Sequence, residues 1–358
     1  MNNYYTPAPR RNITPFVILG VLFVVVIVGV VLLTFLYLHS SSQSQQPAVS
    51  QPKPQIYIGA NVKGLDPPGL PGLTSFEAQA NKNIAIVMWF QAWDASSGKQ
   101  NFDPTLMSAV RDHGSIPMVT WEPWNPGTGP NQPNYSLKNI TQGHFDSYIT
   151  GFAQAAKAWG HPFFLRFAHE MNGNWYPWGI ANGNKPQDYV KAWRHVHDIF
   201  TQVGATNVTW VWAVSAGGNI DTYPSLYPGD SYVDWIAMDG YNHGGKKWQT
   251  FSKVFGKTYQ KLLTIASKPV MIAETATSSK GGSEPGWITD AFTTELPNNF
   301  TQVKAVIWFD ENKEQNWTIN STATTQQAFA TAVHAPIYAS NQYGNLNTSP
   351  IPPPQNVP

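Results

Sequence analysis

The feature that most constrains the fold is a series of eight short apolar segments, rich in β-branched residues, that alternate with longer segments of helical spacing. The eight candidate strands begin at Ile56, Ile84, Ile116, Phe163, Asn207, Val233, Pro269 and Val303. Residues 145–160 and 186–204, which lie between strands, carry apolar residues three and four positions apart and end in Gly, as amphipathic helices do. Continuous apolar strands alternating with helices predict a parallel sheet that is covered on both faces.

Eight such units within residues 55–339 predict an α/β fold of the (β/α)8 TIM-barrel class. The alternative is an open doubly wound sheet. The barrel is favoured because the segment GANVKGLDPPG, at the first strand, lacks the G-x-G-x-x-G spacing of a phosphate-binding loop.

Polar and aromatic residues gather where the candidate strands end. They are Trp93, Glu122, Trp124, His169, Glu170, Tyr241, Glu274, Trp308 and Asp310. In a TIM barrel the carboxyl ends of the strands form the face where active sites lie. The chain also contains 15 Trp and 15 Tyr, whose flat faces stack well on sugar rings. A carbohydrate site at this face is therefore expected.

Two glutamates are the candidate catalytic residues, Glu170 and Glu274. If Val270 and Ile272 face the barrel interior, strand alternation places Glu274 at the top of the same side. By the same alternation Arg166 shares a side with Glu170, where its charge would help to hold a buried carboxylate. A pair of carboxylates across a sugar-binding cleft is the arrangement that glycoside hydrolysis uses.

Other chemistries have less support. His169-Glu170 opens like the zinc motif H-E-x-x-H, but Gly173 occupies the position of the second His. No G-x-S-x-G segment indicates a serine hydrolase, and the chain has no Cys. The net charge of +1 gives no support for nucleic-acid binding. We expect no cofactor, no metal and a monomer.

The segment RFAHEMNGNWYPWG resembles the acid/base motif of glycoside hydrolase family 26, whose members include endo-β-1,4-mannanases. The resemblance implies a TIM barrel with Glu170 as acid/base on the fourth strand and Glu274 as nucleophile on the seventh, acting by retaining double displacement. It also implies substrate-binding roles for His169, Trp175, Tyr241 and Trp308, with Tyr241 holding the nucleophile and Trp308 flooring the cleavage subsite. Trp178 is expected to be a further sugar platform.

The expected activity is endo-hydrolysis of a β-1,4-linked mannan-type polysaccharide. Pro177 and the Phe167-Ala168 pair depart from the mannanase pattern, so mixed-linkage β-glucan (a lichenase) and xylan stay open as substrates. A catalytically inactive cell-surface carbohydrate-binding protein is the alternative from another class, but a binding protein would not need both glutamates.

Residues 1–54 precede the predicted barrel and form a separate region of the sequence. Residues 16–38 are apolar and uncharged, and a helix of that length crosses roughly 30 Å of hydrocarbon. Arg10 and Arg11 precede this predicted transmembrane helix, which places residues 1–15 in the cytoplasm and the barrel outside the cell. Residues 39–54, rich in Ser, Gln and Pro, predict a flexible stalk, and residues 340–358 predict a disordered tail.

Overall fold

The computed structural model describes residues 28–32, 34 and 55–357. The predicted transmembrane helix, residues 16–38, lies outside the described residues except for 28–32 and 34, and the predicted cytoplasmic segment and stalk lie outside them as well. In the part of the chain that is described, no helix is long and apolar enough to cross a membrane.

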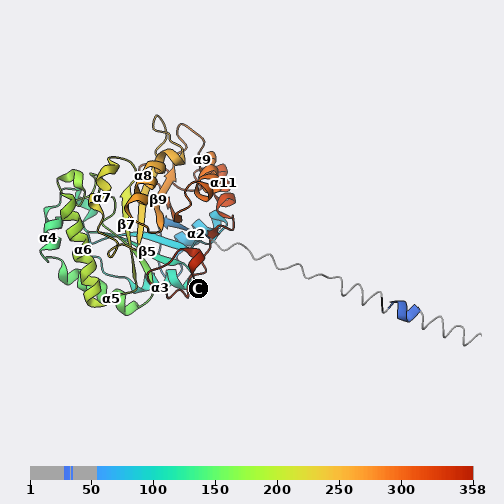
Figure 1. Ribbon diagram of the computed structural model, residues 1–358, viewed down its shortest axis with the longest axis horizontal. Helices are drawn as coiled ribbons and strands as arrows, with labels where there is room; N and C mark the ends of the chain where they lie inside the picture. The colour runs from blue at the N-terminus through green and yellow to red at the C-terminus, as the bar shows by residue number, and fades with distance from the viewer. Residues whose placement is uncertain (1–27, 33, 35–54, 358) are drawn as a thin grey trace, which may run out of the picture. The chain divides into compact units, whose positions relative to one another are not determined.

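The barrel predicted from the strand pattern is confirmed in residues 55–357. Its parallel strands are β1 (Ile56–Val62), β2 (Ile86–Ala92), β5 (Ile116–Glu122), β6 (Phe163–Phe167), β7 (Val208–Ser215), β8 (Trp235–Asn242), β9 (Val270–Thr277) and β10 (Val303–Asp310). Each strand pairs with the next in this order, and β10 pairs with β1, for example at Trp308 and Ala60, so the sheet closes. Helices surround the strands (Figure 1).

The helices follow the strands along the chain. They are α2 (Pro71–Ala80), α3 (Pro104–Asp112), α4 (Leu137–Thr141), α5 (Asp146–Trp159), α6 (Pro186–Val203), α7 (Tyr223–Leu226), α8 (Phe251–Ile265), α9 (Glu284–Asp290), α10 (Leu296–Asn298) and α11 (Ala323–Val333). A short hairpin of β3 (Asp94–Ala95) and β4 (Gly98–Lys99) follows β2, and β11 (Tyr338–Ala339) pairs with β1. The helix ends predicted at Gly160 and Gly204 are confirmed, and both glycines adopt the left-handed conformation that ends a helix.

The core has two layers, and the layer to which a strand residue belongs decides whether it faces the site. Strand residues such as Met118, Ala237 and Ala305 pack together in the barrel interior. Their neighbours in sequence pack outward against the helices. This alternation determines which residues at the strand ends point toward the catalytic face, that is, the face of the barrel at the carboxyl ends of the strands.

Residues 340–357 correct the prediction of a disordered tail, which is wrong for this part of the chain. This C-terminal strap closes the amino-terminal end of the barrel. Trp235 donates its indole N–H to the Ile351 carbonyl at 2.8 Å, and the Tyr57 hydroxyl donates to the Pro352 carbonyl at 2.9 Å. Tyr343 and Ile351 are buried. The Pro- and Asn-rich composition suggested disorder because only a few residues of the strap, such as Tyr343 and Ile351, are apolar, and these anchor it.

Ile351→Ala is expected to lower the free energy of unfolding by about 2–4 kcal/mol, because it leaves a cavity under the barrel interior. Thr348→Ala, at an exposed position of the same strap, is the matched control and is expected to change it by less than about 0.5 kcal/mol. Chemical denaturation of both variants measures the difference. Equal stability of the two would show that the strap does not support the barrel.

Candidate active site

The segment after β6 places Glu170 and His169 in the catalytic face. The strand ends at Phe167, and Ala168 and Glu170 then take positive φ angles of 44° and 52°. A left-handed conformation costs a non-glycine residue about 1–3 kcal/mol and is found mostly at functional sites. The Glu170 amide is fixed by donating to the Ala213 carbonyl at 2.8 Å. The strained turn thus holds both side chains inward.

Glu170 is a buried carboxyl group with one strong partner. The indole N–H of Trp175 donates to its Oε2 at 2.6 Å. Burial, and then the charge of Glu274, raise the pKa of Glu170 to about 8, while the Trp175 hydrogen bond opposes the rise. Glu170 is therefore protonated at neutral pH, as a general acid must be.

Glu274 reaches the site through an irregularity in its strand. Met271 and Ala273 face the barrel interior, whereas Val270 and Ile272 pack outward, so the alternation expected from the sequence is wrong. The pairing of β9 with β8 shifts after Ile272, and Asp239 then lies opposite Glu274. The extra residue of this bulge re-aims Glu274 inward.

Glu274 is held at both oxygens. The Tyr241 hydroxyl donates to its Oε2 at 2.5 Å, which confirms the predicted contact. The Arg166 guanidinium forms an ion pair and a hydrogen bond with its Oε1. Arg166 therefore pairs directly with Glu274, and its charge also opposes the rise in the pKa of Glu170, as expected from strand alternation. These two contacts fix the orientation of the Glu274 side chain.

Arg166 lies at the centre of a fully buried network beneath the two glutamates. It donates to Asp239 Oδ2 at 2.7 Å and to the Thr120 hydroxyl at 2.9 Å. Burial by itself would lower the pKa of Arg166, but the charges of Asp239 and Glu274 raise it. Burial raises the pKa of Asp239 despite this partner. One permanent cation thus compensates two buried acids.

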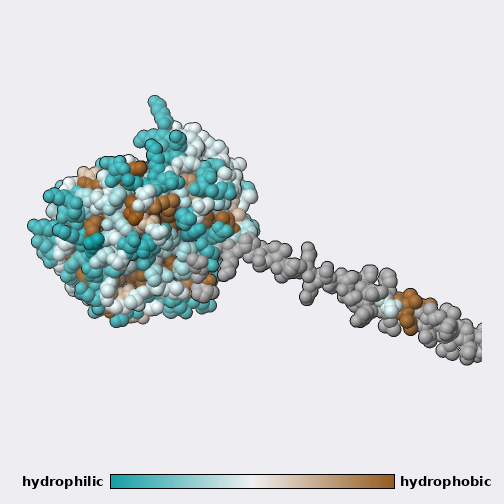
Figure 2. All heavy atoms as spheres, viewed as in Figure 1, coloured by the Kyte–Doolittle hydropathy of each residue, from teal (hydrophilic) through white to brown (hydrophobic). Residues whose placement is uncertain are grey.

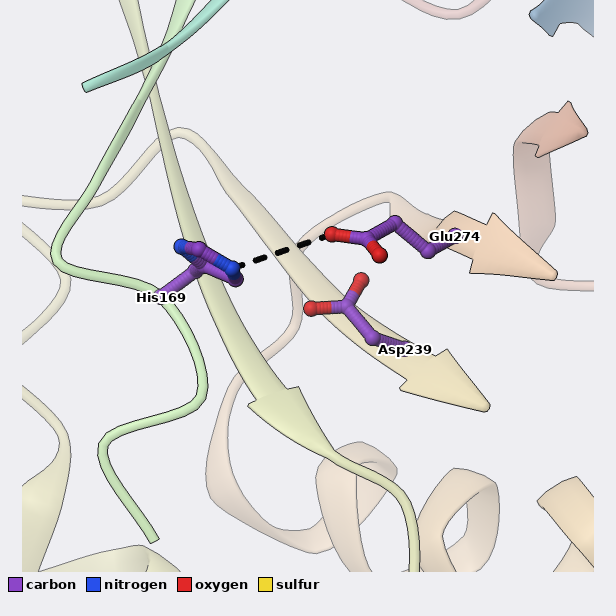
Figure 3. Close-up of side chains that lie close together, drawn as sticks. All are labelled: His169, Asp239 and Glu274. Carbon is purple, nitrogen blue, oxygen red and sulfur yellow. Dashed lines mark ion pairs between the residues drawn. The ribbon is translucent and has the colours of Figure 1, made fainter. Parts of the chain in front are cut away.

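His169 lies beside Glu274, with 3.7 Å between its Nε2 and Glu274 Oε1, and Asp239 lies next to both (Figure 3). Burial and then Arg166 hold the pKa of His169 well below its usual value, so the ring is neutral. Ligand atoms of these three residues lie within 4.8 Å of one another. Arg166 already occupies an oxygen of each carboxylate, which fits an ion-pair network better than a metal site.

The sequence of this chain is similar to those of known glycoside hydrolases. The sequence profile of glycosyl hydrolase family 26 matches residues 109–333. The chain belongs to this family. Endoglucanase H of Acetivibrio thermocellus is 39% identical over 278 residues, which are 75% of this chain and 29% of that protein. The chain therefore spans less than a third of that relative's length. The membership predicted from the segment around Glu170 is confirmed.

Two further proteins are similar at lower identity. A mannan endo-1,4-β-mannosidase of Bacillus subtilis is 28% identical over 143 residues, which are 38% of this chain and 36% of that protein. The solved structure of an endo-β-1,4-mannanase double mutant from Cellulomonas fimi superposes with a TM-score of 0.64 at 17% identity, covering 82% of this chain and 74% of that one. This structural likeness confirms the barrel.

Trp178 and Trp308 are corrections to the predicted site. Trp178 is completely buried and stacks behind Tyr176, with ring centroids 4.4 Å apart, so no sugar can reach its face. Trp308 is also completely buried. It points outward and packs against Phe329 of α11 at 5.2 Å. Strand alternation explains this, since Ile307 on one side of Trp308 faces the barrel interior. Neither indole can serve as a sugar platform.

Trp175 keeps 44% of its surface exposed beside Glu170, as a sugar platform requires. Two aromatic residues that were not singled out in the sequence also lie at the site. Phe309 packs between Tyr241 and Phe90, and its place follows from the inward alternation of β10. Tyr176 packs on His169 at 4.8 Å, and the nearby glutamates help burial to raise its pKa.

Glu122, at the end of β5, adds a third glutamate and a fourth carboxyl group to the site. It is buried, and Trp124 donates its indole N–H to Glu122 Oε2 at 3.3 Å. Burial raises the pKa of Glu122 to about 7, and the charge of Glu274 contributes to the rise. Glu122 lies on the same side of β5 as Thr120 and Met118, which face inward, and its position at the strand end was the sequence signal for it.

Proposed function

We propose that this chain is an endo-acting β-glycanase in which Glu274 is the nucleophile and Glu170 the acid/base. The observation that carries the proposal is that two buried glutamates have different hydrogen-bond and ion-pair partners. Glu170 is kept protonated beside Trp175, whereas Glu274 forms an ion pair with Arg166 and accepts from Tyr241. Two carboxyl groups whose surroundings differ in this way supply the acid and the nucleophile of glycoside hydrolysis.

The reaction proceeds in two displacements, as membership of the family implies. A Glu274 oxygen attacks the anomeric carbon, the bond from that carbon to the leaving oxygen breaks, and Glu170 gives its proton to that oxygen. Glu170, now a carboxylate, then takes a proton from water. The water oxygen attacks the same carbon, the bond to Glu274 breaks, and both glutamates return to their starting states.

The backbone sugar proposed is β-linked glucose. Endoglucanase H is 39% identical over 75% of the chain, whereas the Bacillus subtilis mannosidase is 28% identical over 38%. The greater similarity to a protein named for glucan cleavage outweighs the mannan expected from the motif around Glu170. Mannan is kept as the second candidate because several relatives, at lower identity, are mannosidases.

A panel of soluble β-1,4-glucan, mixed-linkage β-glucan, β-mannan and xylan tests the substrate. We expect the highest kcat/KM on one of the two glucans, with viscosity falling early as internal bonds are cut. Faster release of reducing ends from mannan or xylan would reject the glucan assignment. No release from any of the four, with binding retained, would favour the inactive carbohydrate-binding protein.

The raised pKa of Glu170 predicts the alkaline limb of the activity profile. The acid must carry its proton, so kcat/KM is expected to fall as the pH rises through about 8. Trp175→Phe removes a hydrogen bond that favours the ionised form, so the limb is expected to move to higher pH. Initial rates between about pH 5 and 10 measure both profiles.

Trp159→Phe is the matched control for this variant, since the Trp159 indole donates to Ser108 away from the two glutamates. Its alkaline limb is expected to coincide with that of the wild type. A limb that moves to lower pH in Trp175→Phe, or does not move, would show that Trp175 does not set the proton affinity of Glu170.

We also propose that residues 16–38 anchor the enzyme in a membrane with residues 1–15 inside, and that residues 39–54 are a stalk carrying the barrel outside the cell. The uncharged apolar span and the preceding Arg10 and Arg11 support this orientation. Protease treatment of intact cells is expected to release the barrel. Full protection of the barrel would show that the orientation is wrong.

A further inference from the structure

Two neighbouring loops of the catalytic face form a basic projection. They are residues 243–250, between β8 and α8, and residues 278–283, between β9 and α9. Lys246, Lys247 and Lys280 on these loops are exposed. A strongly hydrophilic projection rises at the top of the view in Figure 2, and Figure 1 shows loops rising there beside α8 and α9. This concentration of charge contrasts with the net charge of +1 for the whole chain.

The two loops are joined by their backbones. The Gly245 amide donates to the Lys280 carbonyl at 2.6 Å, and Gly244 forms a bridge with Lys247 within its own loop. A Cβ on Gly282 would lie 2.3 Å from the Trp248 ring, so the chain passes directly over that indole. The three ammonium groups are thus carried on one defined tip.

The charge of the basic projection is not neutralised by its neighbours. Other lysines of the catalytic face have acidic partners, as Lys63 does with Glu311 at 3.0 Å and Lys313 with Glu314 at 3.5 Å. Within residues 55–357, no carboxylate lies within 4.0 Å of the ammonium group of any of the three projecting lysines. Three unpaired cations on one tip favour an anionic ligand.

The basic projection stands at the edge of the site, on the side of Glu274. His243, at the base of the first loop, packs against Tyr241 at 6.0 Å and Trp317 at 5.6 Å. Tyr241 holds Glu274. Gln315 of the loop after β10 donates to the His243 carbonyl at 2.8 Å. The base of the basic projection therefore lies beside any polymer bound over Glu274.

We propose that the basic projection binds carboxylate groups carried by a polysaccharide chain that lies over Glu274, so that an acid-substituted glycan binds better than a neutral one. This inference rests on the proposed function, because it places a glycan over Glu274. A glycan is favoured over a lipid surface because the loops that carry the cations follow β8 and β9, the strands that carry Tyr241 and Glu274, so a glycan bound over Glu274 lies beside them.

The test compares carboxymethyl with hydroxyethyl β-1,4-glucan of the same length and degree of substitution. Exposed ion pairs are individually weak, so three together change affinity by roughly tenfold. At about 20 mM salt we expect a KM roughly tenfold lower on the carboxymethyl polymer, and at about 0.5 M salt no difference, because the charges are screened. The variant Lys246→Gln/Lys247→Gln/Lys280→Gln is expected to lose the difference and to keep its kcat on the hydroxyethyl polymer.

The matched control removes the same charge elsewhere. Lys138→Gln/Lys185→Gln/Lys191→Gln changes three exposed lysines in or beside α4 and α6, which lie on the opposite side of the barrel from α9 (Figure 1). This control is expected to keep the wild-type preference. Loss of the preference in both triple variants would show a general effect of net charge and would overturn the proposal, as would a wild-type enzyme with no preference.

Gel retardation in the same polymers, and in carboxymethyl and hydroxyethyl mannan, separates this inference from the proposed function. Retardation by carboxymethyl polymers that depends on the three lysines, without hydrolysis of any polymer, would support the basic projection and reject the enzyme. Hydrolysis without lysine-dependent retardation would do the reverse. Lysine-dependent binding to vesicles containing phosphatidylserine, with no carboxymethyl preference, would assign the surface to a membrane and overturn the proposal.

Discussion

Glu274→Gln is expected to lower kcat by about 10⁴-fold or more, because an amide oxygen cannot form the covalent bond that the first displacement requires. The substitution keeps the shape of the side chain, and its one amide oxygen can accept from Arg166 while its NH2 group donates to the Tyr241 hydroxyl oxygen. The fold and the affinity for an oligosaccharide are therefore expected to change little. Release of reducing ends measures the rate, and calorimetric titration measures binding.

Glu314→Gln is the matched control for this variant. Glu314 is another carboxylate of the catalytic face, and its side chain is 63% exposed. The control is expected to keep kcat within about twofold of the wild type. If Glu274→Gln retained wild-type turnover, or if both variants lost activity equally, Glu274 would not be the nucleophile.

Arg166→Met is expected to lower the free energy of unfolding by roughly 3–5 kcal/mol at pH 7, because it leaves Asp239 and Glu274 buried without their shared cation. Burial already raises the pKa of Asp239, and loss of the Arg166 charge, which opposes that rise, should raise it further in the folded chain. The deficit relative to the wild type is therefore expected to shrink as the pH falls from 7 toward 4, because Asp239 takes up a proton and no longer needs the cation. Denaturation curves across this range measure it.

Arg194→Met is the control for the loss of an arginine. Arg194 is exposed and donates to the Pro228 carbonyl rather than to a carboxylate, so its removal is expected to cost about 1 kcal/mol or less. Asp239→Asn in the Arg166→Met background is expected to recover part of the lost stability. A deficit that is independent of pH would show that Arg166 acts by packing and not by charge.

The barrel could be predicted from the sequence because its signal is local and repeated. Each apolar run is long enough to form one strand of the barrel. All eight predicted strands start within two residues of the observed ones. The motif around Glu170 identified the family for a similar reason, since it is one continuous segment. The contact between Tyr241 and Glu274 also followed from that family resemblance.

The rest depended on deviations from regular geometry. The bulge in β9 reverses the side on which Glu274 lies, and a bulge leaves no mark in the apolar pattern. The positive φ angles of Ala168 and Glu170 end the regular alternation of side chains after β6. The direct ion pair of Arg166 is consequently with Glu274. The burial of Trp178 is decided by the placement of Tyr176, which comes from folding of the loop.

Capture of the covalent intermediate tests the central claim most directly. In a 2-deoxy-2-fluoro β-disaccharide with a dinitrophenolate leaving group, the fluorine slows both displacements. The good leaving group speeds only the first displacement, so the glycosyl-enzyme should accumulate. We predict that the intact mass of the wild-type enzyme rises by one disaccharide unit, carried on the peptide that contains Glu274, and that Glu274→Gln takes up none. A label on Glu170 or Glu122, or no label from either the gluco or the manno reagent while the enzyme hydrolyses polysaccharide, would contradict the account.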